Sequence, residues 1–160
     1  MKRSLLLIPL CLLLFSCAAS DRTPDPRAAA KAVISACGGD IDLACADADF
    51  IATNLEGLQD AADAVVYYAT SNNGTEIGFF MLSDERDISK ATAEIRRYIQ
   101  SEREQTASLA ALYPGDELTA RLARYDNAIV DHRGKLVYYI IADPQVRQQA
   151  INALHAFATE

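Results

Sequence analysis

The chain has 160 residues, the length of one domain, with 15 Lys and Arg against 22 Asp and Glu. Lys2 and Arg3 fall in the first sixteen positions, which hold no acid, so 13 basic and 22 acidic residues remain beyond them, a net charge of −9. This balance argues against nucleic acid as a partner and against a polybasic contact with anionic lipid, because both need clustered cations.

The first sixteen residues have the pattern of an export signal. Two cations precede an unbroken apolar run of eleven residues, 5–15, which is too short for a membrane-spanning helix and typical of a signal peptide. The following Leu14-Phe15-Ser16-Cys17 resembles the lipobox of bacterial lipoproteins. The resemblance implies that Cys17 becomes the acylated first residue of the mature protein and holds it at the membrane. Ordinary signal cleavage after Ala18 is the alternative.

The domain boundaries follow from this interpretation. Residues 1–16 form the signal peptide, and residues 17–27 form the lipidated end and a polar tether that contains Pro24 and Pro26. Residues 28–160 form a single domain. The protein is then extracytoplasmic and anchored to the bacterial cell membrane by its lipid.

Two cysteines remain in the mature domain, Cys37 and Cys45. Their spacing and the exported location predict a disulfide, with two free thiols as the alternative. The acidic loop around Asp40 and Asp42 lacks the ligand spacing of an EF-hand, so we expect a solvated loop and no metal site.

The N-terminal part of the domain predicts two short helices and then a hairpin. Asp25-Pro26 begins the first helix, which ends at Gly38-Gly39, and the second begins at Asp42 and ends near Asn54. Residues 64–70 and 75–82 are rich in β-branched and aromatic side chains, and the Asn-Gly turn between them favours a tight hairpin.

The remaining chain repeats this order in a weaker form. Asp84 begins a long helix with an apolar stripe at three- and four-residue steps, and a short helix covers residues 118–122. Residues 127–131 and 135–142 form a second hairpin, and Asp143-Pro144 begins the last helix. The fold class is therefore α+β, with a four-stranded, mainly antiparallel sheet in ββα-ββα order behind two short N-terminal helices.

The strands are apolar on both faces, so both faces of the sheet need a cover. The C-terminal helices can cover one face, and we expect the two N-terminal helices to cover the other. The alternative is an interaction surface for a partner or ligand, built from Tyr68, Phe80 and Tyr139.

No motif of catalysis stands out. The chain has no GxSxG, no Walker loop and no GxGxxG, and its two histidines, His132 and His155, lack the spacing of a zinc site. We therefore name no catalytic residue, no metal ligand and no cofactor.

The order of motifs resembles a family of small Gram-positive lipoproteins with a conserved domain of unknown function. The resemblance rests on Val65-Val66-Tyr67-Tyr68, on residues 76–80 (EIGFF), on Tyr113-Pro114 at the end of the long helix, and on residues 127–130 and 136–141. It implies a location and a fold but no activity. We expect a non-enzymatic module that binds an envelope protein or wall component. An envelope hydrolase that uses acidic residues and a small ligand-binding lipoprotein are the alternatives.

Overall fold

The computed structural model describes residues 25–37, 42–71 and 73–157, and these form an α+β fold around one five-stranded antiparallel sheet. The strand order is β1-β2-β3-β5-β4. The strands are β1 (Leu43–Cys45), β2 (Asp63–Ala69), β3 (Glu76–Met81), β4 (Ile129–Arg133) and β5 (Leu136–Ile141). The helices are α1 (Pro26–Ala36), α2 (Ala48–Asn54), α3 (Ile88–Leu112), α4 (Asp116–Asp126) and α5 (Pro144–Phe157), with short 3-10 turns η1 (Glu56–Leu58) and η2 (Glu85–Asp87).

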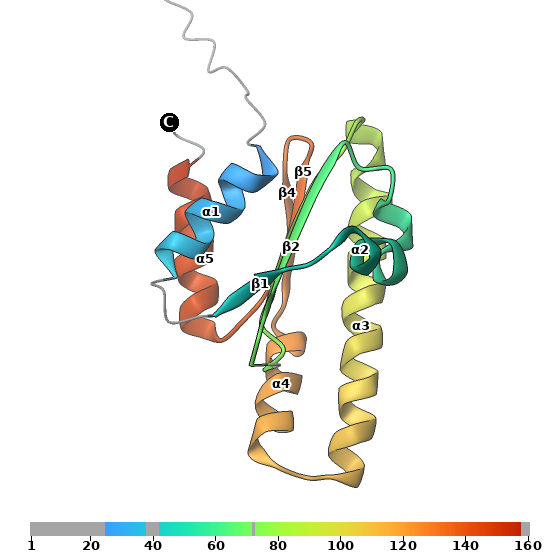
Figure 1. Ribbon diagram of the computed structural model, residues 1–160, viewed down its shortest axis with the longest axis vertical. Helices are drawn as coiled ribbons and strands as arrows, with labels where there is room; N and C mark the ends of the chain where they lie inside the picture. The colour runs from blue at the N-terminus through green and yellow to red at the C-terminus, as the bar shows by residue number, and fades with distance from the viewer. Residues whose placement is uncertain (1–24, 38–41, 72, 158–160) are drawn as a thin grey trace, which may run out of the picture.

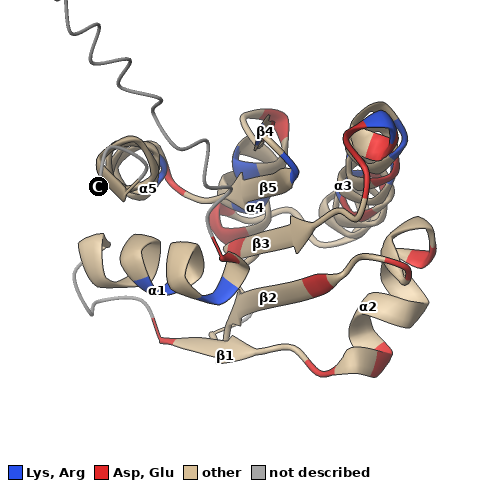
Figure 2. Ribbon diagram, turned by 90° about the horizontal axis from the view of Figure 1, so that it is seen from above, with Lys and Arg blue, Asp and Glu red and all other residues tan. Residues whose placement is uncertain are grey.

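Helices cover both faces of the sheet and give the fold three layers. The helices α1 and α5 lie on one face, and α2 and α3 lie on the other (Figures 1 and 2). Each face therefore has its own apolar core. The prediction that the two N-terminal helices share a face is wrong, because α1 packs with α5 while α2 packs beside α3. Strands that are apolar on both faces do not specify which helix covers which side.

The sheet has five strands, whereas four were predicted. The additional strand, β1, lies where the second helix was expected to begin. The Asp47 carboxylate accepts the amide hydrogen of Phe50 at 2.8 Å and starts α2 there, so Asp42 does not cap a helix. Asp42 instead accepts a hydrogen bond from the Thr70 hydroxyl at 2.7 Å. Residues 43–45 are thereby free to pair with residues 67–69 of β2.

Most of the predicted local signals are confirmed. Gly74 in the first hairpin turn has a φ of +84°, a conformation that favours glycine. Asp25 caps α1 with Pro26 as its first residue, and Asp84 caps the 3-10 turn that leads into α3. The two ββα halves are present, but α3 and α5 lie on opposite faces of the sheet, so the halves are not copies related by a two-fold axis normal to it.

Candidate functional site

The three aromatic residues predicted as an interaction surface lie on one face of the sheet, but they do not form a surface. Phe80 and Tyr139 have no exposed area, since α3 covers them. Tyr68 is 39% exposed and stacks on Phe50 of α2, with ring centroids 6.2 Å apart. Of the three side chains named in this alternative, Phe80 and Tyr139 therefore belong to the core beneath α3, and Tyr68 lies partly exposed against Phe50 of α2.

The predicted disulfide is also wrong, because both cysteines are free thiols. Cys37 is buried, and its Sγ lies 3.7 Å from the carbonyl oxygen of Val146 on α5. Cys45 is exposed at the end of β1, and its Sγ donates to the carbonyl of Ala46 at 3.5 Å. Burial raises the pKa of the Cys37 thiol, which disfavours its thiolate. Cys17, the predicted lipidation site, lies outside the described residues.

A buried carboxyl group is the most unusual chemical feature of the described structure. Glu76 begins β3 beneath α3, and its carboxylate accepts hydrogen bonds from the hydroxyl of Tyr98 at 2.9 and 3.1 Å and from the hydroxyl of Tyr139. Burial raises the pKa of Glu76 to about 7, the two tyrosine hydrogen bonds oppose that shift, and the charge of Glu102 adds to it. This carboxyl therefore changes its charge near neutral pH.

A second layer of polar groups extends the Glu76 cluster along α3 toward α4. Burial raises the pKa of Glu102, and the charge of Arg121 on α4 partly opposes the shift. Burial also raises the pKa of Tyr125 to about 12, helped by the charge of Glu102 and opposed by Arg121 and by a hydrogen bond with Thr106. The polar layer thus joins the sheet to both helices of the α3–α4 pair.

The Glu76 cluster is not placed in a hollow where a substrate could bind. Tyr139 has no exposed area and Tyr98 is 6% exposed, so both phenol rings are buried, while Glu76 itself is half-buried. Glu76 lines none of the hollows found on the described part of the protein. A raised pKa marks a candidate catalytic group only where a substrate can reach it. We therefore interpret the cluster as a structural link that is sensitive to pH.

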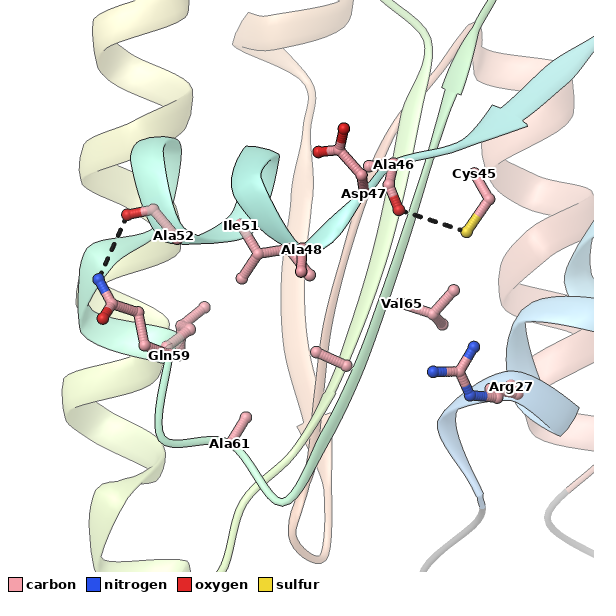
Figure 3. A pocket seen from close by; sticks show the side chains of 12 residues that line it. Arg27, Cys45, Ala46, Asp47, Ala48, Ile51, Ala52, Gln59, Ala61 and Val65 are labelled. Carbon is pink, nitrogen blue, oxygen red and sulfur yellow. Dashed lines mark hydrogen bonds between the residues drawn. The ribbon is translucent and has the colours of Figure 1, made fainter.

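The described surface has a candidate binding hollow of about 360 Å³ at the open edge of β2 (Figure 3). β1 ends at Cys45 and the chain turns into α2, so the first residues of β2 have no neighbouring strand on that side. The outward amide hydrogen of Ala64 is satisfied by the carboxylate of Asp63 at 2.9 Å. The hollow therefore lies where β1 has ended and no longer pairs with β2.

Small apolar side chains form most of the lining of this hollow, with polar groups at its rim. The apolar part consists of Ala46, Ala48, Ile51, Ala52, Leu58, Ala61, Ala64 and Val65 (Figure 3). Arg27 and Gln59 also line the hollow, and each has a partner for its polar group. The Arg27 guanidinium pairs with Asp63 at 3.2 Å, and the Gln59 amide donates to the carbonyl of Ala52 at 3.2 Å. The volume falls at the lower end of the range for small-molecule sites. The hollow suits a compact apolar group.

Two carboxylates share a second, more polar hollow of about 540 Å³ between α3 and β4. Asp126 pairs with Arg103 at 2.5 Å, and Asp131 accepts the amide hydrogen of His132 at 2.8 Å. Both are exposed. Within the described residues, no three His, Cys, Asp or Glu side chains are grouped so that they could hold a metal ion.

Comparisons with known proteins found no match to this chain. No protein-family model, no curated protein and no solved structure matches the chain. The resemblance to small Gram-positive lipoproteins therefore stays a prediction. Of the described helices, none has both the length and the apolar character needed to cross a bilayer.

Proposed function

We propose that this chain is a lipid-anchored extracytoplasmic protein whose domain binds an envelope protein or wall component without catalysing a reaction. The observation that carries the proposal is the sequence Leu14-Phe15-Ser16-Cys17 directly after an apolar run of eleven residues. Acyl chains on one cysteine anchor a protein stably when two or more are present, at about 0.8 kcal/mol per buried methylene.

The arrangement of acidic residues supports a binding role over the hydrolase alternative. The carboxyl with the raised pKa, Glu76, is hydrogen-bonded to Tyr98 and Tyr139 and lines no hollow described above, while the carboxylates that share a hollow are ion-paired or exposed. A hydrolase that uses two acids needs one of them protonated and both beside the substrate. The small-ligand alternative has more support, because the hollow in Figure 3 is apolar and of suitable size.

A detergent phase partition tests the anchor. We expect the wild-type protein to enter the detergent phase and the Cys17→Ser variant to stay in the aqueous phase, because the variant has no thiol to acylate. Cys45→Ser is the matched control, since Cys45 is an exposed free thiol of the folded domain, and it should partition like the wild type. Recovery of the wild type in the aqueous phase would contradict the proposal.

A further inference from the structure

The α3–α4 pair extends beyond the sheet. Thr106 is the last buried residue of α3, although the helix continues to Leu112, and Tyr125 near the end of α4 is the only buried residue of that helix. The last turns of α3 and the first turns of α4 therefore project from the domain. They lie at the opposite end from the start of α1, where the chain enters the domain (Figure 1).

Large apolar side chains gather on this projecting end. Leu112 is 72% exposed, Tyr113 is 70% exposed and Leu109 is 46% exposed. Leu109 and Leu112 are three positions apart and therefore lie on the same side of the helix. Tyr68 is the one other large apolar side chain counted as exposed in the described chain, and it stacks on Phe50. A grouped apolar surface of this kind is typical of a contact site.

The charges beside these residues restrict what can cover them. Asp116 and Glu117 follow Tyr113 after Pro114 and Gly115, are exposed, and have no ion pair or hydrogen bond among the described side chains. They stabilise the first turn of α4 and also make the rim of the apolar patch acidic. A second copy of the chain would bring acids against acids. An anionic lipid surface would repel them too, and the anchor proposed at Cys17 joins the opposite end of the domain.

We propose that the tip formed by Leu109, Leu112 and Tyr113 docks into an apolar groove, rimmed by Lys or Arg, on another protein of the envelope. Exposed Tyr and Leu side chains at a projecting end supply the apolar centre of such an interface. The acidic rim of Asp116 and Glu117 supplies the matching charge. The inference rests on the proposed function for the compartment in which the partner occurs and for the direction in which the tip points.

Site-specific photo-crosslinking in cells that produce the full chain tests the inference. We expect p-benzoylphenylalanine in place of Leu112 to form an adduct with one protein, at a segment in which apolar residues adjoin Lys or Arg. The same probe at Ser101, an exposed position of α3 away from the tip, is the control. In the Leu112 probe protein, the added change Tyr113→Ser or the pair Asp116→Lys and Glu117→Lys should lower the adduct at least tenfold.

Each other outcome overturns the inference. An adduct with a second copy of the chain, an adduct with lipid alone, equal adducts from Leu112 and Ser101, or an adduct unaffected by the charge reversal contradicts it. Tyr113→Ser should keep the melting temperature of the protein within about 2 °C, because this side chain is exposed. The charge-reversed pair should lower it by about 5 °C or less, because it removes favourable charges from the first turn of α4. A detergent partition of the same samples reports the anchor separately, so failure of the docking site is distinguishable from failure of the anchor.

Discussion

The variant Gly78→Ala is expected to destabilise the protein by about 3 kcal/mol, although it adds a single methyl group. Gly78 lies in the middle of β3 and pairs with Tyr139 of β5. A Cβ at position 78 would lie 2.2 Å from Cε1 of Tyr139 and 2.7 Å from its Cζ. The ring cannot move away easily, since it stacks on Phe80 and its hydroxyl is bonded to Glu76. Urea unfolding monitored by circular dichroism measures the change.

A double-mutant cycle gives the control for this variant. Tyr139→Leu removes the part of the ring that approaches position 78, so Gly78→Ala should cost about 1 kcal/mol or less in that background. An equal cost in both backgrounds would show that the close approach of the ring is not the cause.

Replacing Glu76 with glutamine is expected to stabilise the protein at pH 8 by about 3 kcal/mol relative to wild type and to change its stability little at pH 5. The folded state raises the pKa of Glu76 from 4.5 to about 7, chiefly by burial. Between these values the folded protein binds a proton that the unfolded chain has released, so wild-type stability falls as the pH rises through this window. One pKa unit corresponds to about 1.4 kcal/mol.

Unfolding free energies at pH 5, 6, 7 and 8 test this prediction. The matched control is Glu104→Gln, an exposed carboxylate on the same helix as Tyr98, which should keep the wild-type pH profile. Glu102 also has a raised pKa through burial and should leave a small slope in Glu76→Gln. A wild-type stability that stays constant or rises between pH 5 and 8 would contradict the assignment.

The pH dependence bears on the proposed location. Glu76 joins β3 to Tyr98 of α3, and the adjoining polar layer reaches Arg121 of α4. A domain outside the cytoplasmic membrane meets the pH of its surroundings directly. The carboxyl would then loosen the contact between the sheet and the α3–α4 pair as the surroundings become alkaline.

The sequence predicted the elements whose signals are local. The capping pair Asp25-Pro26 and the glycine of the first hairpin turn specify chain direction within a few residues, and the structure confirms them. The short strand β1 could not be predicted in this way, because three residues carry no alternation and residues 43–45 become a strand only by pairing with β2. The disulfide prediction rested on sequence spacing and the expected location alone, whereas Cys37 is a buried thiol at the end of α1 and Cys45 an exposed thiol at the end of β1.

The candidate site was only partly visible in the sequence. Glu76 is the one acid in an otherwise apolar strand, which indicates that its carboxyl has hydrogen-bond partners. Gly78 lies two residues later in the same strand, which indicates that another group approaches the backbone closely there. Their partners come from distant segments: Tyr98 lies on α3 and Tyr139 on β5. The exposure of Leu112 and Tyr113 depends on how far α3 runs past the sheet, which the apolar stripe of the helix does not reveal.

The intact mass of the mature protein, isolated from the membrane of its producing cell, tests the central claim most directly. The account predicts a polypeptide that begins at Cys17 and carries the added mass of acyl chains on that residue, with Cys37 and Cys45 both as thiols. A mature chain that begins at Ala19 and carries no fatty acid would contradict it.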